Sequence, residues 1–137
     1  MPQIVGLLET CLYVEDLERA AEFYERLFGF RRLDSDARFC AFGVGHHDVL
    51  LLFLRGSTLE PVTLPGGVIP PHDGSGRLHF AFAILSEDLG PWQKRLADLG
   101  IAIESRVKWP RGGESLYFRD PDGHLIELAT PGIWSIY

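Results

Sequence analysis

The chain has 137 residues, of which 46% are hydrophobic, 12% aromatic and 23% charged, with a net charge of −6. This composition predicts a single folded domain over residues 1–137 and excludes a disordered chain, which would be poorer in apolar and aromatic residues. The acidic balance argues against a nucleic-acid-binding protein, because contacts to phosphates require a basic surface.

The sequence shows no segment that would carry it to or through a membrane. Its longest apolar run, residues 49–54, is far shorter than the roughly 20 residues needed to span a bilayer. The first ten residues have no basic start followed by an apolar stretch and a small-residue cleavage site. Two cysteines, Cys11 and Cys40, are too few for a disulfide framework. We therefore expect a cytoplasmic protein with no membrane partner.

The first half of the chain predicts a strand, a helix and three further strands. Residues 4–14 alternate in the manner of a strand and are rich in Leu, Val, Thr and Tyr. Asp16 stands at the N-cap of the helix that follows, and Gly29 stands where its C-terminal end requires a left-handed residue. Extended segments are then expected at residues 30–33, 38–44 and 49–55.

The second half repeats this order. Residues 78–84 alternate as a strand, residues 87–99 carry an apolar helical stripe, and Gly100 follows as Gly29 does in the first half. Strands are expected at residues 101–105, 115–118 and 124–129. The repetition predicts an α+β fold of two tandem βαβββ modules that form a curved mixed sheet around a cavity. The expected parts are a first module at 4–56, a linker or lid loop at 57–76, a second module at 77–130 and a tail at 131–137.

Strand alternation selects three polar residues that should face this cavity. Aligning the sequences of the two modules makes Glu9 equivalent to His79, and Leu51 equivalent to Glu127. The apolar alternate residues of these strands should pack under the helices, which directs Glu9, His79 and Glu127 to the other face. Leu51 has no donor atom, so the site has three protein ligands or none.

A divalent cation would make such a group of side chains stable. Two carboxylates in a partly apolar pocket repel each other, and a cation offsets both charges while accepting a neutral imidazole nitrogen. Three protein ligands leave open positions, as in a catalytic metal site. The structural alternative is a solvent-facing Glu near a strand start and a hydrogen-bonded His.

Two segments of the chain resemble the vicinal oxygen chelate superfamily, which includes glyoxalase I, extradiol dioxygenases, methylmalonyl-CoA epimerase, and the fosfomycin- and bleomycin-resistance proteins. The segments are LYVEDLERAAEFYERLFGF (residues 12–30) and SLYFRDPDGHLIEL (residues 115–128). The resemblance extends over nearly the whole chain, and the second segment is its more specific part.

The resemblance implies a metal site and its ligands. The family's ligand on the last strand matches Glu127, and its ligand on the first strand of the second module matches His79. The ligand on the first strand of the first module is usually His and falls on Glu9, which is a departure from the family. One His and two carboxylates favour a divalent ion such as Mn²⁺, Fe²⁺, Mg²⁺ or Zn²⁺.

The resemblance also implies a function. We expect an enzyme of glyoxalase or dioxygenase type, a lyase, isomerase or oxidoreductase, that binds a small oxygenated substrate through neighbouring oxygens on the metal. A homodimer is expected from the family, and the apolar tail at residues 130–137 either contributes to one or packs on its own domain. The alternative is a metal-free protein that sequesters an antibiotic or similar small molecule, as bleomycin-resistance proteins do.

Further residues are expected to bind substrate or assist catalysis. Glu127 and Tyr13 are the candidate catalytic residues, with Tyr13 a hydrogen-bond donor beside Glu9. Arg111 is a candidate for bidentate binding of a substrate carboxylate, although a solvated loop arginine is the alternative. His72 is expected to cover the substrate or, alternatively, to fix a turn. The remaining candidate substrate-binding residues, which are aromatic, are Phe53, Trp109 and Tyr117.

Overall fold

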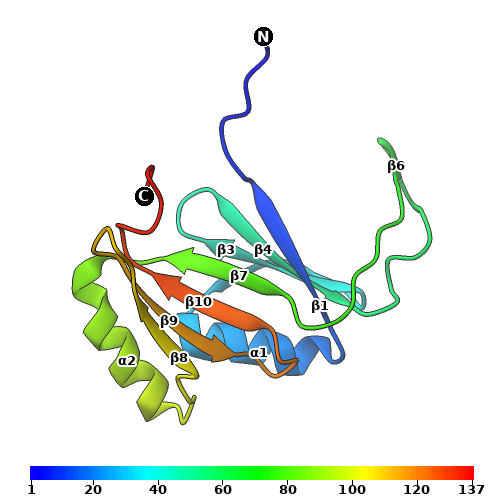
Figure 1. The fold of residues 1–137 in the computed structure, drawn as a ribbon. Coiled ribbons are helices and arrows are strands. Elements are labelled where there is room, and N and C mark those ends of the chain that lie inside the picture. Colours follow the sequence, from blue (N-terminus) through cyan, green and yellow to red (C-terminus); the bar gives the residue numbers. More distant parts are fainter. The chain divides into compact units, whose positions relative to one another are not determined.

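A computed structural model describes residues 1–137, which form two compact units, residues 1–76 and 77–137 (Figure 1). Each unit contains a four-stranded mixed sheet and an α-helix. The strand order is β1-β4-β3-β2 in the first unit and β7-β10-β9-β8 in the second, so the two orders are equivalent. The predicted α+β fold with two βαβββ modules is confirmed.

The elements of the first unit are β1 (Glu9–Val14), α1 (Leu17–Phe28), β2 (Arg31–Ser35), β3 (Phe39–Val44), β4 (Asp48–Leu54), β5 (Val62–Leu64) and β6 (Gly67–Ile69). Those of the second unit are β7 (His79–Ala83), the short 3₁₀-helix η1 (Ser86–Asp88), α2 (Leu89–Asp98), β8 (Ser105–Lys108), β9 (Glu114–Arg119) and β10 (Leu125–Ala129).

The strand registers agree with the alignment of the two repeats. In the first unit, β1 pairs in parallel with β4 so that Cys11 lies opposite Leu51. In the second unit, β7 pairs in parallel with β10 so that Ala81 lies opposite Glu127. Cys11 stands two residues after Glu9 in β1, and Ala81 stands two residues after His79 in β7. Leu51 and Glu127 therefore occupy equivalent places.

Helix α1 begins and ends where its sequence predicts. The Asp16 carboxylate accepts a hydrogen bond from the Arg19 backbone N–H at 3.0 Å, and Gly29 ends the helix with φ of 69°. Its buried face packs on β3 and β4. That face consists of Ala20, Ala21, Tyr24 and Leu27.

Helix α2 starts two residues later than predicted. Residues 86–88 form the 3₁₀ turn η1, in which the Asp88 backbone N–H bonds Leu85 O at 3.1 Å, and the α-helical pattern begins at Leu89. Leu96 is its fully buried residue, and Gly100 follows the helix with φ of 69°. Neither α1 nor α2 has the length and hydropathy that a membrane crossing requires.

One predicted strand is shorter than expected and another is displaced along the chain. Residues 4–8 lie outside β1 and extend away from it (Figure 1). Strand β4, the parallel partner of β1, begins only at Asp48. The bond from Val49 N–H to Leu8 O is therefore the last contact between the two strands, and residues 4–7 have no strand beside them. The strand predicted at residues 101–105 lies instead at Ser105–Lys108 (β8), because the Ile101 N–H bonds Leu96 O at the end of α2. The linker, expected to be a loop, contains the antiparallel hairpin β5–β6.

Candidate functional site

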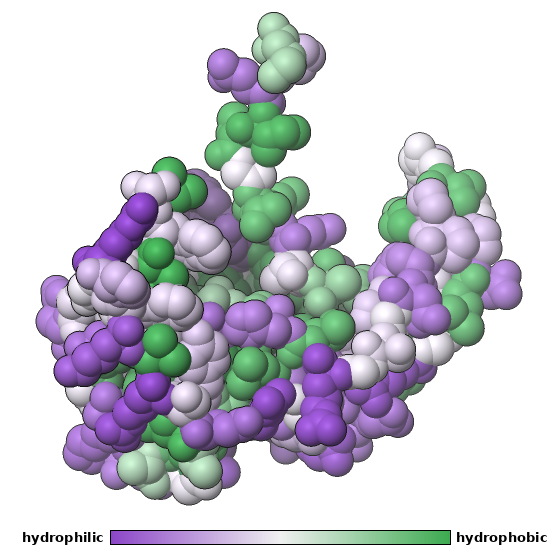
Figure 2. Space-filling model, in the orientation of Figure 1, coloured by the Kyte–Doolittle hydropathy of each residue, from purple (hydrophilic) through white to green (hydrophobic).

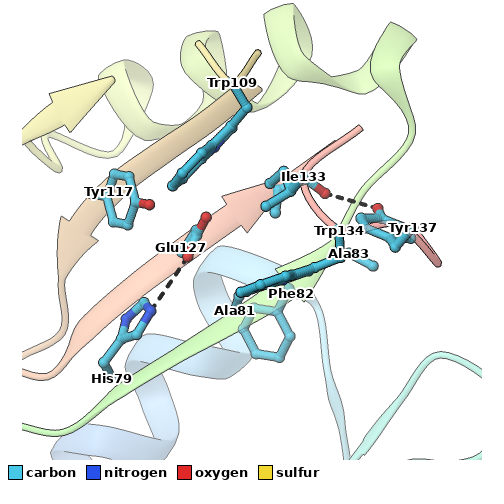
Figure 3. Close-up of a pocket in the computed structure, with 11 residues that line it drawn as sticks. His79, Ala81, Phe82, Ala83, Trp109, Tyr117, Glu127, Ile133, Trp134 and Tyr137 are labelled. Atoms are coloured by element: carbon cyan, nitrogen blue, oxygen red, sulfur yellow. Dashed lines mark hydrogen bonds and ion pairs between the residues drawn. The ribbon is translucent and has the colours of Figure 1, made fainter. Parts of the chain in front are cut away.

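The second unit contains a cavity of about 340 Å³ on the face of its sheet (Figure 3). Strands β7 and β10 contribute His79 and Glu127, the two predicted ligands that lie in this unit. In β10, Ile126 and Leu128 are fully buried on the opposite face, as the alternation predicted. The other lining residues come from β7, β9, β10, the loop before β9 and the tail: Ala81, Phe82, Ala83, Trp109, Tyr117, Ala129, Ile133, Trp134 and Tyr137.

The imidazole of His79 is oriented by the backbone of the neighbouring strand. Its Nδ1 lies 3.0 Å from the carbonyl oxygen of Leu125. A carbonyl oxygen only accepts, so Nδ1 carries the proton and donates it. In the neutral ring, Nε2 then has a free lone pair, which is the form in which histidine binds metal ions. This side chain is half-exposed at the edge of the cavity.

Glu127 is held in place by hydrogen bonds on the side of its carboxylate away from His79. Its side chain is buried, with 7% of the residue exposed. The Ser115 hydroxyl donates to Oε1 at 2.5 Å, and the Trp109 indole N–H donates to the Ser115 oxygen at 2.8 Å. The second oxygen, Oε2, lies 3.3 Å from Nε2 of His79. The two hydrogen bonds, from the Trp109 indole to Ser115 and from Ser115 to Glu127, therefore fix one carboxylate oxygen and leave the other facing the imidazole.

The His79–Glu127 pair fits a divalent cation. A lone pair on Nε2 facing a carboxylate oxygen is unfavourable unless a proton or a cation lies between them. Two donor atoms at about 2.1 Å from one ion, at a tetrahedral angle, would be about 3.4 Å apart, close to the observed separation. Within either unit, no group of three or more His, Cys, Asp or Glu side chains is gathered at one point. The second unit thus contains two candidate ligands.

Tyr117 and Trp109 form walls of the same cavity. Tyr117 pairs with Glu127 across β9 and β10, and its ring centroid lies 6.2 Å from that of His79. Burial raises the pKa of the Tyr117 hydroxyl above its ordinary value, and the negative charge of Glu127 adds to the rise. The hydroxyl therefore remains protonated at neutral pH and is available as a donor.

Three other predicted residues meet in the first unit. Tyr13 is buried in β1, its hydroxyl forms a hydrogen bond with Nδ1 of His72, and the Phe53 ring lies 4.8 Å from the His72 ring. The loop that carries His72 is held by Thr58, whose hydroxyl donates to the His72 carbonyl at 2.5 Å. A Cβ at Gly74 would clash with the Tyr13 ring, so this close approach requires glycine. The linker is therefore anchored on β1.

Glu9 and Arg111 lie outside these two clusters. Glu9 begins β1 in the first unit and is exposed, so its participation with His79 and Glu127 stays a prediction. Arg111 is exposed in the turn before β9 and is not among the residues that line the cavity.

Two features of the site were not predicted from the sequence. Ser115 stands two residues before Tyr117 on one strand, a spacing that places both side chains on the same face of β9 and is the signal that could have indicated its contact with Glu127. The tail, for which a dimer contact and packing on its own domain were both open, lines the cavity of its own unit, and its role at the site was not predicted. The tail has no periodic pattern that would indicate where it folds.

Comparisons with known proteins agree with this architecture. Residues 6–128 match the family model of the Glyoxalase/Bleomycin resistance protein/Dioxygenase superfamily. Metallothiol transferase FosB of Bacillus licheniformis is 30% identical over 133 residues, which are 96% of this chain and 79% of that protein. Fosfomycin resistance protein FosX of Listeria innocua is 29% identical over 134 residues, covering 91% of this chain and 89% of that protein.

Solved structures give the same result. The crystal structure of lactoylglutathione lyase from Agrobacterium tumefaciens superposes with a TM-score of 0.88 at 29% identity, covering 98% of this chain and 99% of the other. FosX from Listeria monocytogenes superposes with a TM-score of 0.67 at 25% identity, covering 93% and 94%. From its strand order, its repeat and these matches, the chain belongs to the Glyoxalase/Bleomycin resistance protein/Dioxygenase superfamily, the vicinal oxygen chelate proteins.

Proposed function

We propose that this chain is a metal-dependent vicinal oxygen chelate enzyme that acts on a small oxygenated organic substrate. His79 and Glu127 are the two metal ligands of the second unit, and Glu9 is the third ligand predicted from the repeat. The observation that supports the proposal most directly is the pairing of the free Nε2 of His79 with a carboxylate oxygen at 3.3 Å. Because Nδ1 donates to Leu125, the ring is already in the ligand tautomer.

The residues around this pair have distinct roles in the proposal. A bound divalent ion would supply a Lewis acid for the neighbouring oxygens of the substrate. Ser115 holds Oε1 of Glu127, so only Oε2 is directed to the site. Tyr117 offers a protonated hydroxyl beside the pair, and the Trp109 ring limits the access of water. Tyr13, whose hydroxyl is held by His72, is the candidate donor from the first unit.

The names of the relatives suggest one reaction class among several. Metallothiol transferase FosB and fosfomycin resistance protein FosX match most of the chain, so transfer of a nucleophile to an antibiotic is a candidate reaction. The similarity to a lactoylglutathione lyase adds isomerase-type lyase chemistry. We also propose that the protein works as a cytoplasmic homodimer, since Cys11 and Cys40 are both free thiols and the N-terminal segment is apolar and exposed.

Metal binding tests the proposal. Protein purified without an affinity tag is analysed for bound metal, stripped with a chelator, and titrated with Mn²⁺ and Zn²⁺ in a calorimeter. We expect one ion per chain and a loss of at least about tenfold in affinity in His79→Ala and Glu127→Gln, because each removes a ligand. Glu9→Gln should weaken binding in the same way.

The matched control is a double variant, His46→Ala with His47→Ala. These two histidines lie in the turn between β3 and β4 and could bind metal adventitiously, so their removal should leave the affinity for one ion unchanged. No uptake of metal by the unmodified protein, together with metal-independent binding of small molecules, would contradict the proposal and favour the sequestering alternative.

A further inference from the structure

The cavity of the second unit has two chemically different ends. His79, Glu127 and the Tyr117 hydroxyl form the polar end. The rest of the wall consists of alanines, aliphatic and aromatic side chains, and none of the eleven lining residues is Lys or Arg. In the view of Figure 3, the rings of Trp109 and Trp134 lie on opposite sides of the Glu127 carboxylate. A ligand that reaches Glu127 therefore meets large apolar rings.

The tail that forms the apolar end is held in a defined conformation. The Tyr137 hydroxyl lies 2.9 Å from Ala129 O and 3.1 Å from Ile84 O, so it is anchored on the ends of β10 and β7. The main-chain oxygen of Tyr137 accepts hydrogen bonds from three consecutive backbone N–H groups, those of residues 132–134. Gly132 packs so closely on Gly113 that a Cβ there would clash with its backbone. These contacts place Ile133 and Trp134 at the cavity.

Trp134 lines the cavity although 70% of it is exposed. An exposed indole beside a metal-binding pair gains most when a flat apolar group covers it, because stacked aromatic rings bury apolar area and interact favourably. A small dianion would have only the proposed metal ion to offset its charge and would leave the apolar rings uncovered, since no cationic side chain lines this cavity. The wall therefore favours one chemical class of substrate over the other.

We propose that the tail, through Trp134 and Tyr137, is the specificity-determining wall of the site. It selects a substrate whose oxygen-bearing end is attached to a flat apolar or aromatic group, and it disfavours a small phosphonate or phosphate. This inference rests on the proposed function, because it takes His79 and Glu127 as the end that receives the substrate oxygens.

Two hydroxamates with the same pair of neighbouring oxygens test it. Benzohydroxamate carries a phenyl group where acetohydroxamate carries a methyl group. With the metal-loaded protein, tryptophan fluorescence and calorimetry should show benzohydroxamate binding at least about tenfold more tightly. Trp134→Ala should reduce that preference to less than about threefold. Phosphonoacetate and fosfomycin, both phosphonates, should bind more weakly than benzohydroxamate.

A change of charge gives a second test, in which one ligand should gain affinity while the other loses it. Trp134→Lys should weaken benzohydroxamate and strengthen phosphonoacetate, because it adds a cation at the apolar end. Ile136→Ala is the matched control, since Ile136 lies in the same tail, is 94% exposed and does not line the cavity. Circular dichroism of each variant verifies that it is folded.

The outcomes separate the two proposals. Equal affinities for the two hydroxamates, or tighter binding of phosphonoacetate, in protein that has taken up one metal ion would overturn the role of the tail and leave the metal site standing. An unchanged preference in a folded Trp134→Ala variant would also overturn it. Absence of metal in the same samples would instead contradict the proposed function.

Discussion

Ser115 is a small residue that should have a large effect on metal affinity. Its hydroxyl donates to Glu127 and accepts from the Trp109 indole, so one oxygen atom connects the aromatic wall to the candidate ligand. We expect Ser115→Ala to lower metal affinity by about 10–100-fold, as losses of hydrogen bonds that orient metal ligands do. Calorimetric titration measures the effect. Ser105→Ala is the control, because Ser105 is exposed on β8. An unchanged affinity in Ser115→Ala would show that Glu127 needs no such support.

Cys40 should make the stability of the protein depend on pH in the alkaline range. It is buried on β3, and burial raises the pKa of its thiol from 9.0 to about 11, a rise that the nearby Arg32 opposes. The folded state therefore holds this proton more tightly than the unfolded state, so the free energy of unfolding falls as pH rises from 9 towards 11. Urea denaturation at pH 8 to 11 measures the slope.

The comparison with Cys40→Ala isolates this contribution from those of the tyrosines, which also titrate in this range. The variant should lose stability less steeply with pH than the unmodified protein. Identical slopes for the two proteins would mean that the thiol does not contribute.

Among the elements, helix α1 depends on its N-cap residue, Asp16. Asp16 accepts the Arg19 N–H at 3.0 Å and thereby satisfies one of the free backbone donors of the first turn. Asp16→Ala should reduce the free energy of unfolding by about 1 kcal/mol, as measured in urea. Asp16→Asn keeps a capping oxygen and should lose much less. Equal losses in both variants would attribute the effect to the charge near the helix N-terminus rather than to the hydrogen bond.

The elements also show which features a sequence predicts well. Asp16 and Gly29 mark the ends of α1 because capping chemistry is local, and it acts within one helical turn. The alternation of β10 correctly separates Ile126 from Glu127, because neighbouring residues of a strand face opposite sides. Strand ends follow less directly from the local sequence, since the extent of β1 depends on where its partner β4 starts, far along the chain.

At the scale of the whole molecule, the repeat was the most informative signal. It predicted equivalent strand orders and placed Leu51 and Glu127 at equivalent positions, which the registers of the two sheets reproduce. The tail and the Ser115 contacts could not be predicted in this way. They depend on loop conformations, such as the close packing of Gly113 on Gly132, that follow no periodic pattern.

The N-terminal segment, residues 1–8, should take part in self-association. Figure 2 shows apolar surface along this segment, and Ile4 and Leu7 are 92% and 89% exposed. So much apolar surface on a short extended segment is unfavourable in water and is typical of a contact with another chain. We expect analytical ultracentrifugation to give twice the 15.4 kDa of one chain, and the double variant Ile4→Ser with Leu7→Ser to shift the mass towards 15.4 kDa.

A control of the same residue types uses the hairpin β5–β6. Leu64 and Ile69 are 48% and 46% exposed there, so Leu64→Ser with Ile69→Ser removes a similar pair of apolar side chains from another surface. If residues 1–8 form the contact, this variant should keep the mass of the unmodified protein. A monomeric unmodified protein, or equal dissociation of both double variants, would contradict the prediction. Because association depends on concentration, all three proteins are compared over the same range.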